Sequence, residues 1–150
     1  MTKPLAEASS VRAIVALYRQ FETIARHSDI SLAQYRMMLY LRRGPQRAGA
    51  IAAASAVKKP TVSAMLTSLR EKGWISDASD PDDARAIAVS LTKAGSARLA
   101  AFEKELAESM ARLAPDSGLR ELNAALARFY AGMAQTEDAR LREIEDRLLS

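Results

Sequence analysis

The sequence predicts a mostly α-helical protein with one β-hairpin near its middle. Apolar residues recur at steps of three and four over long stretches at both ends of the chain, which is the spacing of one helix face. Between these stretches lie two short helical segments and then a charged turn, residues 80–83, flanked by short alternating segments. That pattern is typical of a hairpin. The 150 residues suit a single domain with its own core.

The first helix is expected over about Ser9 to His27. Asp29 or Ser31 could cap the following helix, because a short side-chain oxygen accepts from free N–H groups of a first turn. That second helix is expected from residue 32 to about Leu41, and residues 42–45, Arg-Arg-Gly-Pro, end it. One face of the first helix is apolar, with Val11, Ile14, Val15, Tyr18, Phe21 and Ile24.

The middle of the chain predicts a helix-turn-helix. Residues 46–49 are too few for more than a turn or a single bridge of strand, and a short alanine-rich helix is expected over Ala50 to Ala56. Pro60 opens the next helix, where its missing N–H costs nothing, and Gly73 follows its end. This helix has an apolar face and a face of small polar residues, as in the second helix of a helix-turn-helix.

The hairpin is expected over about Trp74–Ala78 and Ala86–Leu91, and Thr92 is the expected N-cap of a long helix that ends at Pro115. A last helix is expected from about Ser117 to Leu148. Its apolar stripe has no obvious partner within so small a chain, so pairing with a second copy would explain its length. The stripe comprises Leu119, Leu122, Leu126, Phe129 and Met133, and continues at Leu141, Ile144 and Leu148.

Positive charge is concentrated in the middle of the chain. Residues 31–95 hold ten basic and five acidic side chains, whereas residues 96–150 hold eight basic and ten acidic ones. Residues 1–30 hold four basic and three acidic side chains. A basic middle beside an acidic tail favours a polyanion that binds to the middle alone, although chance segregation of charge would give the same pattern.

Several functional classes lack support in the sequence. The chain has no cysteine, which excludes disulfides and thiol chemistry. His27 is its one histidine and reads as a surface or capping residue, so neither a metal site nor a cofactor is expected. No matched nucleophile and base suggests an enzyme. The N-terminal residues lack a signal-peptide core, and no apolar run is long enough to cross a membrane. We therefore expect a cytoplasmic protein.

The residues from the hairpin into the long helix resemble the wing of the MarR family of bacterial transcription regulators. In that family an Asp-x-Arg pair is followed, after three residues, by a β-branched residue and then by x-Leu-Thr-x-x-Gly. Each position is matched here, by Asp83, Arg85, Val89, Leu91, Thr92 and Gly95. The order of the expected helices also agrees with the family over essentially the whole chain.

The resemblance implies a winged helix-turn-helix fold in one domain, residues 1–150. Residues 31–95 would form the DNA-binding lobe, and residues 1–30 and 96–150 would supply dimerisation helices. The expected protein is a homodimeric regulator, most simply a repressor that covers a roughly palindromic operator in double-stranded DNA.

By the same resemblance, Arg85 is the wing residue that enters the minor groove, where a guanidinium suits the concentrated negative potential. Asp83 could hold that guanidinium in place. Side chains with two-pronged hydrogen bonding are scarce on the second helix of the motif, so direct reading of bases should be sparse and DNA shape should supply much of the specificity. The other expected DNA-binding residues are Arg47, Lys58, Lys59, Thr61, Ser63, Thr67, Ser68 and Arg70.

Alternatives remain for several residues. Arg36, Arg42 and Arg43 could contact phosphates. For Arg42 and Arg43, at the end of a helix, attraction of cations by the helix dipole is a simpler explanation. Trp74 reads as packing at the base of the wing. The aspartates of the turn resemble no calcium loop. The whole module could also serve protein–protein contact without binding DNA.

A small aromatic or phenolic effector is a further implication of the resemblance. The family binds such anions between the dimerisation helices and the DNA-binding lobe. The residues that fall in the matching helices are Tyr18, His27, Tyr35, Arg36 and Met38. An ordinary place in the core or on the surface also explains each of them, and that interpretation is favoured because apolar stripes usually belong to the core.

Overall fold

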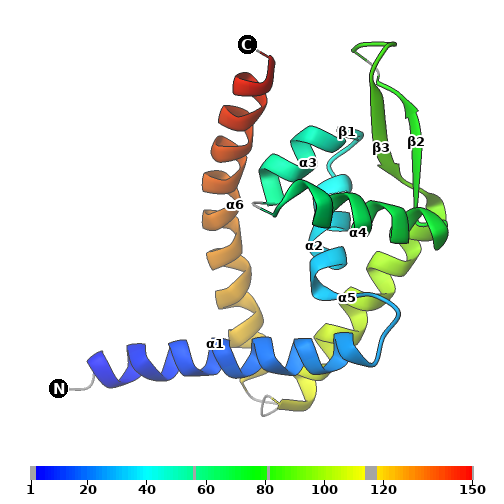
Figure 1. Cartoon of the computed structure of the whole chain (residues 1–150). Coiled ribbons are helices and arrows are strands. Elements are labelled where there is room, and N and C mark those ends of the chain that lie inside the picture. Colours follow the sequence, from blue (N-terminus) through cyan, green and yellow to red (C-terminus); the bar gives the residue numbers. More distant parts are fainter. Residues whose placement is uncertain (1–2, 56, 81, 114–117, 150) are drawn as a thin grey trace.

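A computed structural model of the chain describes residues 3–55, 57–80, 82–113 and 118–149 (Figure 1). Four residues that the sequence predicts at helix ends or in the charged turn lie outside these ranges: Ala56, Pro81, Pro115 and Ser117. Along the described residues the elements follow in the order α1 (Lys3–Arg26), α2 (Leu32–Leu41), β1 (Gln46–Arg47), α3 (Ala48–Ser55), α4 (Lys59–Glu71), β2 (Ile75–Ser79), β3 (Ile87–Leu91), α5 (Lys93–Leu113) and α6 (Leu119–Leu149). The mostly helical fold with a central hairpin is confirmed.

Two helices begin earlier than the sequence indicated. Helix α1 starts at Lys3, not near Ser9, because a proline in a first turn removes only an N–H that a helix leaves unpaired. Helix α3 begins at Ala48, not at Ala50, since it follows directly on the short strand β1.

Side-chain caps fix the start of two helices. Ser31, and not Asp29, caps α2, and it forms a capping box with Gln34, in which each side chain satisfies a backbone N–H of the other residue. The Gln34 amide also donates to Ser68 Oγ at 3.1 Å, which ties α2 to α4. Thr92 caps α5 as predicted, accepting from Gly95 N–H at 3.0 Å.

The core lies where α2, α4, α5 and the base of the hairpin meet. Trp74 is 8% exposed and has the Lys72 ammonium 4.8 Å above its ring centroid, so its expected role in packing at the wing base is confirmed. The most deeply buried side chains include Phe102, Ile30, Met38, Ile51, Leu69, Leu99 and Val89.

Gly95 in the first turn of α5 permits a close approach to the hairpin base. A Cβ at this position would lie 2.0 Å from the Trp74 carbonyl oxygen. That same oxygen accepts from Thr92 N–H at 3.0 Å. The glycine of the wing motif is therefore explained by contact with backbone, which has no room to yield.

The hairpin belongs to a three-stranded antiparallel sheet in the order β1-β3-β2. Strand β2 pairs with β3 from Ile75 opposite Leu91 to Ser79 opposite Ile87. Strand β1 adds to the other edge, with Arg47 opposite Ala88. The expected two-stranded wing thus gains a short third strand, and this strand carries Arg47.

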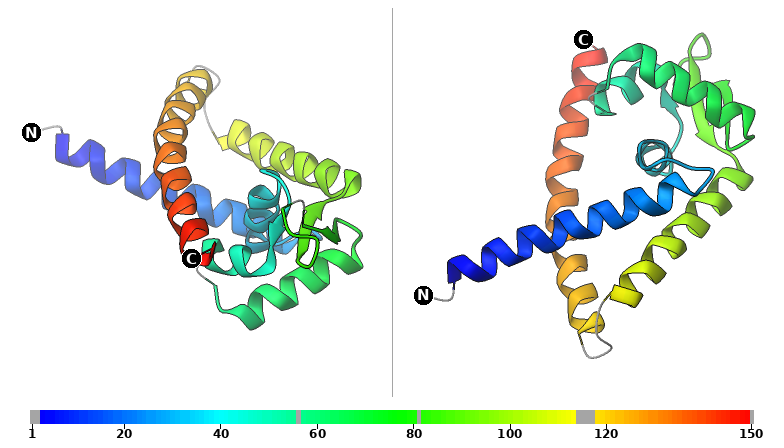
Figure 2. Two further views of the ribbon diagram at one scale, coloured as in Figure 1. Left: turned by 90° about the horizontal axis from the view of Figure 1, so that it is seen from above. Right: turned by 60° about the horizontal axis from the view of Figure 1, so that its bottom comes forward.

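Helices α1 and α6 leave apolar side chains uncovered. In Figure 2 the N-terminal half of α1 extends past α6 and away from the rest of the chain. The exposed apolar side chains on these two helices are Val11, Ile14, Val15, Tyr18, Leu122, Phe129, Tyr130 and Met133. The stripes predicted from sequence are therefore present on the surface along much of both helices.

Among the described residues, none of the helices combines the length and the apolar character that a membrane span requires.

Candidate nucleic-acid interface

Helix α4 presents a polar, uncapped N-terminal end to solvent. Lys58 stands at its N-cap without a side-chain hydrogen bond to the helix, and no acidic residue lies in the first turn. A helix start of this kind attracts anions through its free N–H groups and dipole. Lys58, Lys59, Thr61, Ser63 and Thr67 are all exposed, while the opposite face of α4 is buried. These predicted residues therefore lie together on one accessible surface.

Ser68 and Arg70, also predicted to contact DNA, have partners within the chain. Ser68 is partly buried and accepts from Gln34. The Arg70 guanidinium forms a two-pronged pair with Asp77 of β2, through contacts of 2.9 and 3.0 Å. Arg70 thus links the end of α4 to the wing, and the Asp77 carboxylate partly neutralises its charge.

The tip of the hairpin is a closely hydrogen-bonded turn. Asp80 Oδ1 accepts from Asp82 N–H at 2.8 Å, and Asp83 Oδ1 accepts from Arg85 N–H at 3.0 Å. Aspartate favours turns through such contacts with the backbone two residues on. The structure thus gives two of the three acidic residues at the tip a backbone role.

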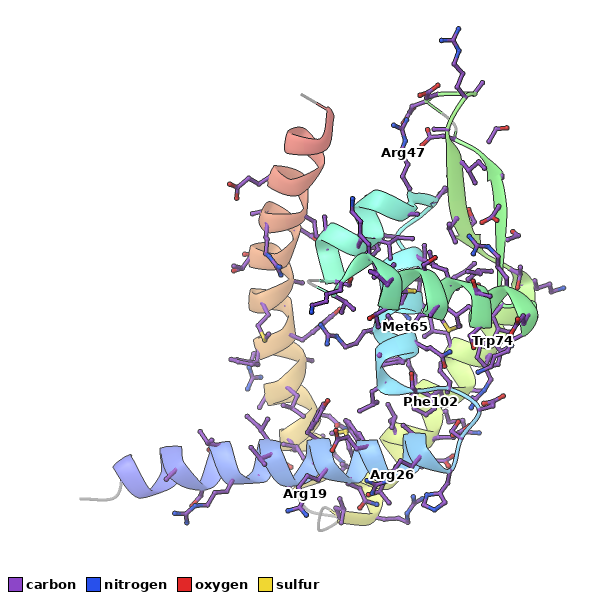
Figure 3. All side chains as sticks on the ribbon, in the orientation of Figure 1. Arg19, Arg26, Arg47, Met65, Trp74 and Phe102 are labelled. Atoms are coloured by element: carbon purple, nitrogen blue, oxygen red, sulfur yellow. The ribbon has the colours of Figure 1, made fainter. Side chains whose placement is uncertain are left out.

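Arg47 reaches from β1 to this tip, as Figure 3 shows. Its Nε lies 2.6 Å from Asp80 Oδ2, and its Nη2 lies 3.7 Å from Asp83 Oδ2. The hydrogen bond from Arg47 holds the pKa of Asp80 below its ordinary value, and the same bond raises the pKa of Arg47. The pair is therefore charged at neutral pH.

Asp83 does not hold the Arg85 guanidinium, contrary to the expectation from sequence. Its carboxylate bonds to the Arg85 backbone and faces Arg47. Arg85 is exposed, and within the described part of the chain its side chain forms no ion pair. The wing guanidinium is consequently free to meet a partner from outside.

Of the five residues considered for an effector, Arg36 lines the cavity between α2 and α6, and the other four do not. Met38 is fully buried in the core. Tyr18 is exposed on α1, and His27 Nδ1 lies 2.8 Å from the Thr23 carbonyl oxygen at the end of α1, which fits the surface or capping role. Tyr35 donates to Glu103 at 3.3 Å, and burial, followed by that carboxylate, raises the Tyr35 pKa to about 12.

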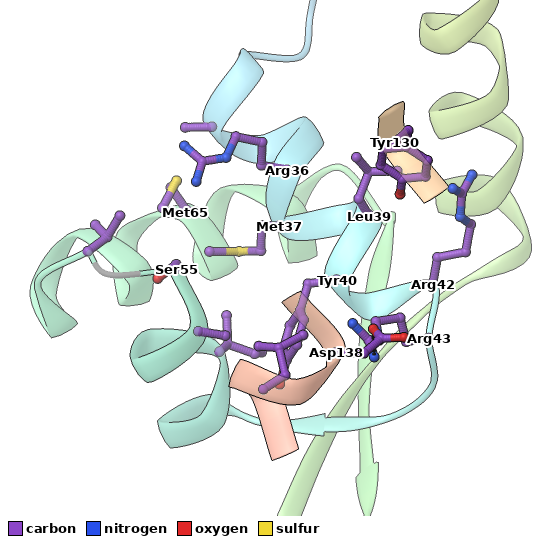
Figure 4. A pocket seen from close by; sticks show the side chains of 15 residues that line it. Arg36, Met37, Leu39, Tyr40, Arg42, Arg43, Ser55, Met65, Tyr130 and Asp138 are labelled. Atoms are coloured by element: carbon purple, nitrogen blue, oxygen red, sulfur yellow. Dashed lines mark ion pairs between the residues drawn. The ribbon is translucent and has the colours of Figure 1, made fainter. Parts of the chain in front are cut away.

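The cavity has a volume of about 580 Å³ and lies between α2, α3, α4 and α6 (Figure 4). Its walls combine aromatic and sulfur-containing side chains with arginines. Arg43 meets Asp138 of α6 at 2.6 Å, and Arg42 pairs with Glu103 of α5 at 3.1 Å. The lining includes Arg36, Met37, Tyr40, Met65, Tyr130 and Leu141.

Sequence reasoning missed the residues that join distant segments. Arg98 of α5 donates to Asp29 at 2.8 Å and to Ser28 at 2.7 Å, both in the loop before α2. It also pairs with Glu105 at 3.1 Å. The sequence gives no sign of these contacts, because serine, aspartate, glutamate and arginine are all common on protein surfaces and have no regular spacing here. In the described residues, no cluster of three or more side chains suitable for a metal ion occurs.

Comparisons with known proteins agree with this geometry. A family model described as "MarR family" matches residues 28–86. The repressor CouR, solved bound to a 23-mer DNA duplex, is 28% identical with a TM-score of 0.59, over 84% of this chain and 89% of CouR. Wild-type apo MarR from E. coli is 20% identical with a TM-score of 0.60, over 79% of this chain and 94% of MarR. No curated protein sequence matches the chain.

A third similar structure is a mutant of MepR from S. aureus bound to an oligodeoxyribonucleotide. It is 21% identical with a TM-score of 0.58, and the match covers 84% of this chain and 97% of that protein. The helix-turn-helix followed by a hairpin defines the fold as a winged helix. Over residues 28–86, which include the helix-turn-helix, the chain is similar to the MarR family.

Proposed function

We propose that this chain is a DNA-binding repressor that acts as a homodimer. The observation that carries the proposal is the pairing of an exposed, basic α4 N-terminus with a wing whose Arg85 is free. In Figure 1 both lie on the side of the fold away from α1. This arrangement suits α4 in a major groove and the wing in the adjacent minor groove.

The contacts expected from α4 are mostly to phosphates. Lys58 and Lys59 would neutralise phosphates, and Thr61, Ser63 and Thr67 would donate hydrogen bonds to phosphates or base edges. Residues 31–95 would then form the DNA-binding lobe of a single domain. Because each neutralised phosphate releases counterions, binding should weaken steeply with salt.

The second copy is proposed to cover the apolar stripes of α1 and α6. Val15 is 54% exposed and Phe129 is 63% exposed, although both belong to stripes with the spacing of a buried face. An uncovered apolar surface of this extent marks an interaction site. Two-fold pairing would present two α4 helices and two wings to an operator with two half-sites.

The cavity beside α2 is the proposed site for a small aromatic anion. Tyr40 and Tyr130 would provide aromatic walls, and Arg36 would provide the cation. Because α6 and α3 both line this cavity, a ligand there could favour one spacing of the two α4 helices over another. It would do so only by binding one arrangement more tightly.

A thermal-shift screen of aromatic carboxylates with the wild type and Arg36→Gln tests this proposed site. The absence of any shift in melting temperature or DNA affinity would contradict it.

A second candidate function is a winged helix that binds another protein and no DNA. The small side chains of α4 keep this alternative open, since they include few of the residues that read bases. A gel-shift with the DNA upstream of the chain's own gene separates the two functions. The wild type should retard this DNA, and Arg85→Ala and Lys59→Ala should each weaken the retardation. Arg19→Ala is the matched control, because Arg19 is an exposed arginine on α1, far from the wing (Figure 3).

A further inference from the structure

Arg47 was expected to contact a phosphate, but its position favours a different task. Its backbone belongs to β1, which pairs with β3 at the edge of the sheet. Its side chain runs along the sheet to the turn, where its Nε lies 2.6 Å from Asp80 Oδ2. We propose that Arg47 is a positioning residue that clamps the wing tip and so presents Arg85 to DNA. This inference rests on the proposed DNA-binding function.

The clamp is more than a surface ion pair. The Asp80 side chain is only 10% exposed, whereas that of Arg47 is 40% exposed. Asp80 accepts from Arg47 through one oxygen and from Asp82 N–H through the other. Its N–H also donates to the Ala86 carbonyl across the turn at 2.9 Å. A partly buried carboxylate with several partners orders the chain more than an exposed pair does.

The path from Arg47 to Arg85 runs through Asp83. The Asp83 carboxylate lies 3.7 Å from the Arg47 guanidinium with one oxygen and accepts from Arg85 N–H with the other. Asp83 N–H also donates to the Asp80 carbonyl at 3.3 Å. Arg47 therefore contacts Asp80 and Asp83, the two aspartates whose hydrogen bonds to the backbone shape the turn that carries Arg85.

Charge gives the clamp a second consequence. The turn holds three carboxylates, Asp80, Asp82 and Asp83, and a single arginine, which by themselves would repel a polyanion. Arg47 offsets part of this negative charge from the side of the sheet. Because its guanidinium is already bonded to Asp80, it has less capacity to bind a phosphate directly.

The variant Asp80→Asn separates a clamp from a direct phosphate contact. If Arg47 bound phosphate, removing the carboxylate would free it and strengthen DNA binding. The clamp requires the opposite, because an amide keeps the bond to Asp82 N–H but offers no anion to Arg47. Asp82→Asn is the matched control: it removes the same charge from the same turn, and Asp82 is exposed with no ion pair of its carboxylate among the described residues.

Affinity is measured by fluorescence anisotropy with a labelled operator duplex. Asp80→Asn should weaken binding several-fold, whereas Asp82→Asn should leave it unchanged or tighten it. Arg47→Lys should also weaken binding, because a lysine cannot reproduce the guanidinium fork but remains a good phosphate ligand. Asp80→Asn binding as tightly as Asp82→Asn, or wild-type affinity in Arg47→Lys, would overturn the inference.

A measurement without DNA keeps the inference separate from the proposed function. Proton–nitrogen NMR spectra of the arginine Nε groups, with the Arg47 signal assigned by its loss in Arg47→Lys, should show the Arg47 Nε–H protected from exchange in the wild type and in Asp82→Asn. That protection should be lost in Asp80→Asn, and its presence there would contradict the clamp. If the wild type shows protection but binds no DNA, the proposed function fails and the role of Arg47 in presenting Arg85 fails with it, although the ion pair itself stands.

Discussion

At the scale of single residues, the structure distinguishes side chains that the sequence treats alike. Arg47, Arg70 and Arg85 are all arginines of the basic middle segment. The first two are bonded to aspartates of the wing, while Arg85 is exposed without such a pair among the described residues. Arg85 is therefore the arginine of the wing that remains available to DNA.

Removal of the Arg85 side chain should lower affinity for operator DNA by about 1–3 kcal/mol, because a desolvated guanidinium contact is lost. Stability should not change, since this side chain has no ion pair in the described structure. Titration of labelled DNA, alongside a thermal melt, measures both effects. Equal affinity for Arg85→Ala and wild type would contradict the proposed wing contact.

The structural explanation for a glycine at position 95 can be tested independently of DNA. Gly95→Ala would place a methyl group 2.0 Å from the Trp74 carbonyl oxygen. Overpacking of this kind costs about 1–3 kcal/mol or more, so the melting temperature should fall clearly. Gly49→Ala is the control, because a Cβ there meets nothing within 4 Å and alanine favours a helix. Equal melting temperatures for the two variants would refute the explanation.

At the scale of elements, the order of helices and strands could be predicted from sequence, but the contacts between them could not. The apolar period revealed α2, α4 and α5, and glycines and prolines marked most of their ends. Helix α1 extends beyond the apolar stripe that begins at Val11, because its residues from Lys3 to Ser10 include a single large apolar residue, Leu5, and so carry no periodic signal. The Arg47–Asp80 and Arg98–Asp29 pairs were unpredictable, since any exposed carboxylate within reach could have served.

The Arg98–Asp29 pair should make stability depend on acid. The hydrogen bond from Arg98 lowers the pKa of Asp29 from 3.8. A lowered pKa in the folded state gives stability that is present above pH 3.8 and is lost as pH falls further. Because Asp29 is 59% exposed, the effect should be below about 1 kcal/mol. Urea unfolding at neutral and acid pH should show a smaller pH dependence in Asp29→Asn, and an unchanged dependence would contradict the assignment.

The α4 surface predicts sparse reading of bases. From its N-cap to Thr67, the exposed polar side chains are Lys58, Lys59, Thr61, Ser63 and Thr67, and none has the two-pronged geometry that selects guanine or adenine. Arg70, near the end of α4, has that geometry but is paired with Asp77. Single-base changes should therefore have small effects at most positions of each half-site, with larger effects where DNA shape changes. Strong discrimination at every position of both half-sites would show that this view of α4 is wrong.

At the scale of the whole molecule, the uncovered stripes of α1 and α6 predict the dimer. The charge of Phe129→Glu would be costly to bury against a partner, so the variant should shift the protein toward monomer. Sedimentation measures the mass, and Gln135→Glu is the control, since it adds the same charge at an exposed polar position of α6. A wild type that sediments as a monomer at high concentration would contradict the dimer.

We propose above all that this chain is a sequence-specific DNA-binding regulator. The most direct test is the affinity of the wild type for DNA upstream of its own gene and for scrambled DNA, at two salt concentrations. Specific binding should be much tighter on the upstream DNA, and both affinities should fall as salt rises, by a factor set by the number of phosphate contacts. Equal affinity for the two duplexes, or no binding to either, would contradict the claim.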